Sequence, residues 1–81
     1  MLTVSVISPE AVLFEGQTES VVAPAFDGQV GILTGHAPMV TLLGTGELRL
    51  GASGQRFTVE GGFIQVVDDV VRVVTEKASA T

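Results

Sequence analysis

The sequence predicts an all-β fold: a two-sheet antiparallel β-sandwich, or flattened barrel, of about nine to ten short strands. Fourteen valines and eight threonines favour strands, because β-branched side chains suit a pleated surface and lose rotamer freedom in a helix. Ten glycines divide the chain into short segments, and no window has uninterrupted helical apolar spacing. Two packed sheets are expected because one flat sheet would leave an apolar face in water.

The first strands are predicted from period-two alternation. Leu2, Val4 and Val6 are separated by polar residues, which is typical of a strand with one buried face. A second strand is expected over residues 12–14, and Gly16 is expected to end it. The sequence therefore predicts an opening pair of strands.

The next part of the chain contains two short strands and two breaks. Residues 21–23 are predicted to form a strand leading into Pro24, and residues 30–32 form the next one. Asp27-Gly28 between them is a strong turn signal. Residues 35–38, Gly-His-Ala-Pro, have the composition of a loop.

Two further strands are expected over residues 39–43 and 47–50. Gly44-Thr45-Gly46 is predicted to join them in a turn, because glycine tolerates positive φ. Residues 51–54 are predicted to form the following loop.

The last strands show the clearest patterns. Phe57 and Val59 alternate with polar residues, and Gly61-Gly62 then breaks the chain. Residues 63–74 are predicted to be a compact hairpin that turns at Asp68-Asp69. Five apolar positions are predicted to be buried in the core: Val6, Phe57, Val59, Ile64 and Val73.

The composition indicates one domain, over residues 1–81, whose last six residues, 76–81, are expected to be a polar tail. With 46% hydrophobic and 16% charged residues, the sequence is too apolar for a disordered segment. A net charge of -5 and four scattered basic residues argue against nucleic acid as a partner. The absence of cysteine excludes disulfides and thiolate metal sites.

No apolar run approaches the roughly 20 residues of a spanning helix, so no direct membrane insertion is expected. The first residues lack the basic stretch and long apolar region of a secretory signal. We expect a cytosolic or organelle-interior location and a monomeric isolated domain.

The sequence contains few residues that could carry out catalysis. His36 is the only histidine, and tyrosine, cysteine and tryptophan are absent, so no nucleophile with a base is indicated and no catalytic residue is assigned. One imidazole cannot complete a zinc site, and Asp68-Asp69 lacks the ligand pattern of a calcium loop. The glycines of residues 28–35 look like a phosphate loop but lack its Gly-Lys-Ser/Thr ending. Neither a metal nor a cofactor is predicted.

Three blocks of the chain together resemble one family. Residues 27–43 resemble the Gly-x-x-Gly-(Ile/Val)-(Leu/Tyr)-x-Gly-His-Ala-Pro-(Leu/Met)-(Leu/Val) signature of the F-type ATP synthase epsilon subunit. Residues 60–66 resemble its Gly-Gly strand, followed by a valine-rich strand at 70–74, and residues 6–10 and 14–16 resemble its opening hairpin. The resemblance covers essentially the whole chain in the family's order and spacing.

The resemblance implies the family's β-sandwich domain and a non-catalytic role in the central stalk during ATP synthesis. It implies two partners, the gamma subunit and the membrane rotor ring. It places the complex peripherally at the cytoplasmic face of a bacterial inner membrane, or at the equivalent face inside an organelle. In the family, the sandwich is followed by a two-helix C-terminal hairpin. The six residues after position 75 are too few to form it. We therefore expect a short form of the subunit that does not restrain ATP hydrolysis through that hairpin.

Carried over by position, the resemblance also implies contact residues. His36, Met39 and Thr41 fall where the family meets gamma. The turn at Asp27, Gly28 and Gln29 falls where it approaches the ring, although some members have an acidic residue in place of Gln29.

Met39 and Leu42 have core packing as an equally weighted alternative. For the whole chain, the alternative function is a free-standing ligand-binding β-sandwich such as a carbohydrate binder. An aromatic content of 5%, all phenylalanine, argues against it.

Overall fold

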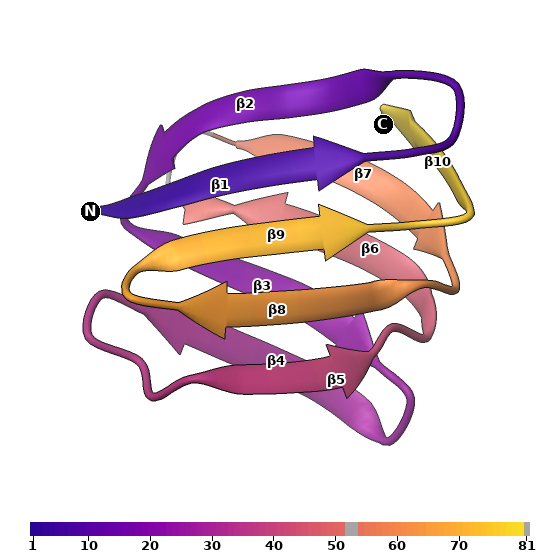
Figure 1. Cartoon of the computed structure of the whole chain (residues 1–81). Helices are drawn as coiled ribbons and strands as arrows, with labels where there is room; N and C mark the ends of the chain where they lie inside the picture. Colours follow the sequence, from indigo (N-terminus) through magenta and orange to yellow (C-terminus); the bar gives the residue numbers. More distant parts are fainter. Residues whose placement is uncertain (52–53, 81) are drawn as a thin grey trace.

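A computed structural model of the chain describes residues 1–51 and 54–80, in which ten strands form two stacked layers (Figure 1). The strands are β1 (Leu2–Ile7), β2 (Val12–Thr18), β3 (Ser20–Ala25), β4 (Gly28–Leu33), β5 (Met39–Leu42), β6 (Thr45–Leu50), β7 (Gln55–Glu60), β8 (Phe63–Val67), β9 (Val70–Val74) and β10 (Lys77–Ala80). The predicted number of strands is confirmed. Residues 52 and 53 of the predicted loop, and Thr81, lie outside the described part.

The two layers are five-stranded sheets. Sheet A has the order β2-β1-β9-β8-β5, and sheet B has the order β10-β7-β6-β3-β4. Along the described chain, each paired ladder is antiparallel except β1 with β9, which is parallel. The predicted antiparallel sandwich is therefore confirmed, with one parallel ladder added.

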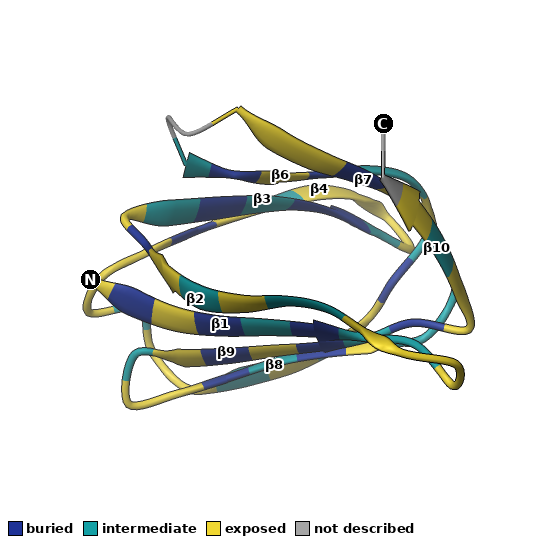
Figure 2. Ribbon diagram, turned by 90° about the horizontal axis from the view of Figure 1, so that it is seen from above, coloured by how far each residue is buried: buried dark blue, intermediate teal, exposed yellow. Residues whose placement is uncertain are grey.

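The core fills the space between the sheets, and strands such as β1, β7, β8 and β9 turn every second residue inward (Figure 2). All five residues predicted to be buried are confirmed: Val6, Phe57, Val59, Ile64 and Val73 expose 4% of their surface or less. Phe14 of β2 and Phe57 of β7 meet across the sandwich, with ring centroids 6.5 Å apart at 62°. This edge-to-face contact joins sheet A to sheet B.

The second strand is longer than predicted. Gly16 does not end it, because β2 continues to Thr18 and pairs with β1 through Val4 opposite Gly16. The ring of Phe14 covers the glycine, and a Cβ at Gly16 would meet Cζ of that ring at 3.2 Å. The aromatic ring supplies the packing that glycine lacks.

The turn predicted at Gly44-Thr45-Gly46 is wrong. Thr45 and Gly46 begin β6, and the chain passes at Gly44 from sheet A to sheet B, so β5 and β6 are not a hairpin. Neither glycine has positive φ. A Cβ at Gly44 would lie 2.7 Å from the Ala25 carbonyl oxygen, so close backbone approach explains this glycine.

The predicted polar tail contains a strand. Residues Lys77–Ala80 form β10, which pairs with β7 and places Ala78 opposite Val59. The corner before it is fixed by buried Thr75, whose Oγ1 lies 3.0 Å from Gly61 O and 2.9 Å from Lys77 O. The polar composition of these residues did not indicate a strand. Backbone pairing at a sheet edge does not require apolar side chains.

Both tight turns of the prediction are present. Phe26 and Asp27 form the turn between β3 and β4, and Gly28 has φ +135°. Asp68 and Asp69 have φ 49° and 61° and form the two-residue turn between β8 and β9. Two positive φ values indicate a type I′ turn, whose twist suits a hairpin.

Candidate functional site

An apolar row crosses the outer face of sheet A. The strand registers place Ile7 opposite both Val12 and Val74, Val74 opposite Phe63, and Phe63 opposite Leu42. These residues point outward, because their neighbours along each strand point into the core. We call this set the apolar row: Val12, Ile7, Val74, Phe63 and Leu42.

Much of this surface is exposed. Val12 and Leu42, at the two ends of the apolar row, expose 57% and 62% of their surface, and Phe63 exposes 38%. Val40, Val67 and Val70 are further exposed apolar side chains on strands β5, β8 and β9. A contiguous exposed apolar patch of this kind is typical of a protein–protein interface.

The neighbouring hollow is partly polar. It has a volume of about 420 Å³ and is lined by Gln65, Val67, Asp68, Val70 and Arg72 of the β8–β9 hairpin. Gln65 and Arg72 are paired across the two strands. No aromatic ring lines this hollow, and in the described part of the chain no group of three or more acidic or histidine side chains could hold a metal ion. The hollow offers a guanidinium and an amide for hydrogen bonding.

The loop predicted at residues 35–38 follows a tight turn. The His36 amide donates to the Leu33 carbonyl at 3.1 Å, and Gly35 has φ +85° at the third turn position. Positive φ there is typical of a type II turn and favours glycine. The half-buried His36 ring has Nδ1 2.7 Å from the Ala37 carbonyl. The imidazole is therefore held beside its own loop.

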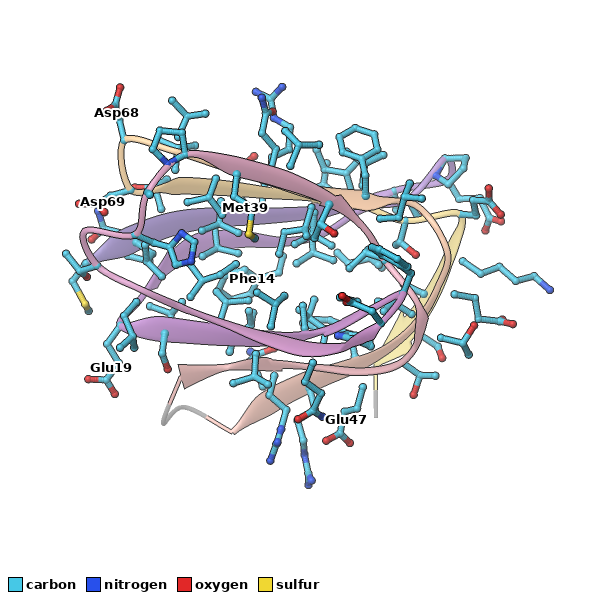
Figure 3. The ribbon with its side chains drawn as sticks, turned by 90° about the horizontal axis from the view of Figure 1, so that it is seen from below. Phe14, Glu19, Met39, Glu47, Asp68 and Asp69 are labelled. Atoms are coloured by element: carbon cyan, nitrogen blue, oxygen red, sulfur yellow. The ribbon has the colours of Figure 1, made fainter. Side chains whose placement is uncertain are left out.

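The residues predicted to meet gamma do not share one orientation. Met39 packs against the core and points into the space between the sheets (Figure 3). Thr41, two residues along β5, lies opposite buried Ile64 and is half-buried. For Met39 the alternative of core packing holds, whereas Leu42, for which it was also considered, is exposed. The outward residues of β5 are Val40 and Leu42.

The turn predicted to approach the ring is fully accessible. Asp27, Gly28 and Gln29 are all exposed, and Phe26 beside them exposes 67% of its surface. The Phe26 amide donates to the Leu42 carbonyl at 3.2 Å, so this turn lies at the end of β5. The loop after β4 leads into the other end of β5. One short edge strand therefore joins the two predicted contact regions.

The sequence prediction missed most of the apolar row, although a signal for it was present. Strand β7 alternates strictly between polar and apolar residues, but β8 and β9 are apolar at most positions on both faces. Near-continuous apolar strands are typical of sheets covered on both sides. The composition of this hairpin could therefore have indicated a second covered face.

The comparisons with known proteins agree on one family. A family model described as "ATP synthase, Delta/Epsilon chain, beta-sandwich domain" matches residues 1–81. The ATP synthase epsilon chain of Leptospira borgpetersenii is 48% identical over 77 residues, which are 93% of this chain and 61% of the relative. The epsilon chain of a Synechococcus species is 42% identical over 79 residues, 95% of this chain and 58% of the relative. This chain thus spans about three-fifths of the length of these curated relatives.

Solved structures show the same fold. A chain in the cryo-EM structure of the Euglena gracilis mitochondrial ATP synthase, OSCP/F1/c-ring, superposes with a TM-score of 0.88 at 23% identity, covering 98% of this chain and 52% of that one. A chain of the Tetrahymena thermophila mitochondrial ATP synthase central stalk and c-ring gives a TM-score of 0.80 at 18% identity, covering 96% and 65%. Within the described residues, no helix is long and apolar enough to cross a bilayer.

Proposed function

This chain belongs to the ATP synthase delta/epsilon β-sandwich family, and from that premise we propose that it couples two parts of an F-type ATP synthase rotor. In this proposal it is a non-catalytic piece of the central stalk that binds the gamma subunit and the membrane rotor ring. It is attached to the membrane only through these partners, at the cytoplasmic face of a bacterial membrane or the equivalent face inside an organelle.

The apolar row carries the proposal. Folding does not require these residues to be apolar, because they point away from the core and three of them expose between 38% and 62% of their surface. Covering such a patch with a partner removes apolar area from water at roughly 25 cal/mol per Å². A stalk subunit needs a binding face of this kind more than it needs a pocket.

The gamma contact is proposed on this face and on the loop that leads into it. Val40 and Leu42 on β5 are exposed on the outside of sheet A, and His36 in the loop before them is half-buried. Met39 and Thr41 support the same strand from inside. Their role in the contact is therefore to hold β5 in place, while its outward residues bind.

The ring contact is proposed at the turn of Asp27, Gly28 and Gln29, with Phe26 as an added apolar side chain. This turn and the loop at residues 34–38 lie at opposite ends of β4 (Figure 1). A rigid sandwich that holds these two regions at a fixed separation suits a component that transmits rotation between two partners.

The gamma contact is tested by capture of the domain on purified gamma subunit. We expect alanine at Val40 and Leu42 together to weaken binding by about tenfold or more, because buried apolar anchors dominate interface energy. His36→Asp should also weaken binding and leave the isolated domain folded. Alanine at Thr58 is the control, since this exposed residue of β7 lies on the outer face of sheet B, away from the proposed contact. Unchanged capture by the Val40, Leu42 and His36 variants would contradict the proposal.

The ring contact is tested separately by cross-linking. The chain has no cysteine, so Gln29→Cys gives a single reactive position. We expect it to cross-link to rotor-ring subunits carrying cysteine in their polar loops, whereas a cysteine at Thr58 on the outer face of sheet B should not. Equal cross-linking from both positions would contradict the assignment of the turn.

A further inference from the structure

Asp69 connects three segments that are far apart in the sequence. Its carboxylate Oδ1 accepts a hydrogen bond from the Gly35 amide at 2.7 Å, across 34 positions of sequence. Its backbone carbonyl accepts the Thr3 amide at 2.8 Å, at the beginning of β1. Asp69 itself lies in the β8–β9 turn with φ 61°. This one residue therefore joins the loop before β5, the hairpin and the first strand.

The loop at residues 34–38 depends on such a connection. It carries the chain from β4 in sheet B to β5 in sheet A, and Thr34, Gly35, Ala37 and Pro38 are all exposed. The hydrogen bond from the His36 amide to Leu33 is local and shapes the turn without attaching it to sheet A. The bond to Asp69 provides that attachment. An ionised acceptor makes such a bond shorter and stronger than one between neutral groups.

We propose that Asp69 is a positioning residue that holds this loop against the β8–β9 hairpin, so that His36 and the beginning of β5 are presented to the partner in one geometry. The inference deepens the proposed function and rests on it where docking is concerned. A loop that is ordered before binding loses less conformational entropy when the partner arrives. Asp69 acts on docking through the loop and does not need to contact the partner itself.

Asp68 provides a matched control in the same turn. It also has positive φ, at 49°, but its side chain points away from the molecule (Figure 3). Glycine is favoured at both central positions of a type I′ turn, so Asp68→Gly and Asp69→Gly both preserve the hairpin. Asp69→Gly removes the acceptor for the Gly35 amide, and Asp68→Gly does not. Asp69→Asn keeps a side-chain carbonyl acceptor and tolerates positive φ.

The experiment compares the wild-type domain with these three variants. Hydrogen exchange of the Gly35 amide, measured by NMR, reports on the loop, and binding to purified gamma subunit reports on docking. We expect Asp69→Gly to accelerate Gly35 exchange by about three- to tenfold, because a solvent-exposed charged hydrogen bond is lost. We expect the same variant to weaken gamma binding by a similar factor. Asp68→Gly should change neither quantity beyond twofold, and Asp69→Asn should recover most of both.

Two results would overturn the inference. One is equal Gly35 exchange in Asp69→Gly and Asp68→Gly, which would mean that the carboxylate does not hold the loop. The other is faster exchange in Asp69→Gly with gamma binding equal to that of Asp68→Gly, which would mean that a held loop is not needed for docking. Failure of the wild-type domain to bind gamma is a different result: it overturns the proposed function and, with it, the docking role of Asp69. The exchange comparison still decides whether Asp69 positions the loop.

Discussion

The outer face of sheet A differs in chemistry from the part of sheet B formed by β6, β7 and β10. On sheet A one line of outward positions, the apolar row from Val12 to Leu42, crosses all five strands beside the polar line of Ser5, Arg72 and Gln65. On sheet B the outward positions of β6, β7 and β10 are polar or charged: Thr45, Glu47, Arg49, Arg56, Thr58, Glu60, Lys77 and Ser79. The inner faces of both sheets are apolar. Folding explains the inner faces, but it does not require the outward residues of the apolar row to be apolar.

Charged side chains on the outer face of sheet B pair with one another. The register places Arg49 directly opposite Arg56, an arrangement that is unfavourable for two cations. Glu47 lies between them, with carboxylate oxygens 3.7 Å from Arg49 Nε and 3.9 Å from an Arg56 guanidinium nitrogen. This surface is suited to water. In the apolar row of sheet A, by contrast, Val12, Phe63 and Leu42 expose 38% to 62% of their surface.

The largest expected effect is on stability, and it distinguishes the inward from the outward side chains of sheet A. Ile64→Ala should lower the free energy of unfolding by about 2–5 kcal/mol, because the side chain is fully buried and leaves a cavity. Leu42→Ala on the adjacent strand should change it by only about 0.5 kcal/mol, since that side chain is 62% exposed. Urea denaturation of both variants measures the difference. Similar losses for both would show that the apolar row belongs to the folding core.

The second effect compares the two outer faces directly. Phe63→Asp places a charge in the apolar row, and Thr58→Asp places one in the outer face of sheet B. We expect Phe63→Asp to reduce affinity for purified gamma by about tenfold or more, because a charge buried at an interface without a partner is costly. Thr58→Asp should stay within about twofold of wild type. Far-UV circular dichroism should confirm that both variants are folded. A larger loss from Thr58→Asp would reverse the assignment of the faces.

The smallest effect concerns the charges of sheet B. Glu47→Gln leaves the two opposed arginines without an anion between them, and the side chains involved are between 41% and 55% exposed. We expect a loss of about 1 kcal/mol or less in the free energy of unfolding, and the loss should change with salt concentration. Gamma binding should be unaffected. If this substitution weakened gamma binding as much as Phe63→Asp, sheet B would also have to be part of the interface.

Much of the fold could be predicted because its determinants are local. Strands such as β7 alternate strictly, so the identity of Phe57 and Val59 as core residues follows from the sequence alone. The Asp-Gly and Asp-Asp turns are short-range signals of the same kind. Residues 76–81 gave no such signal, and β10 exists because β7 has an edge with which it can pair.

The contact residues could be placed only approximately. Resemblance located the loop and β5, but residues 39–43 are apolar at four of five positions, so alternation could not say which ones face inward. The register with β8 decides it: Met39 and Thr41 lie opposite buried residues, and Val40 and Leu42 do not. In a strand that is apolar on both faces, pairing with the neighbouring strand decides which side chains point inward.

The sequence by itself determined an all-β chain, the inward residues of its alternating strands, the Asp-Gly and Asp-Asp turns and the family to which it belongs. Only the tertiary structure decided that outward residues from five strands form one apolar row, that Gly44 permits close approach to Ala25, and that Asp69 holds the loop at Gly35. The physical reason is distance along the chain. Alternation and turn chemistry act between near neighbours, whereas a surface and a hydrogen bond across 34 residues exist only once the sheets have assembled.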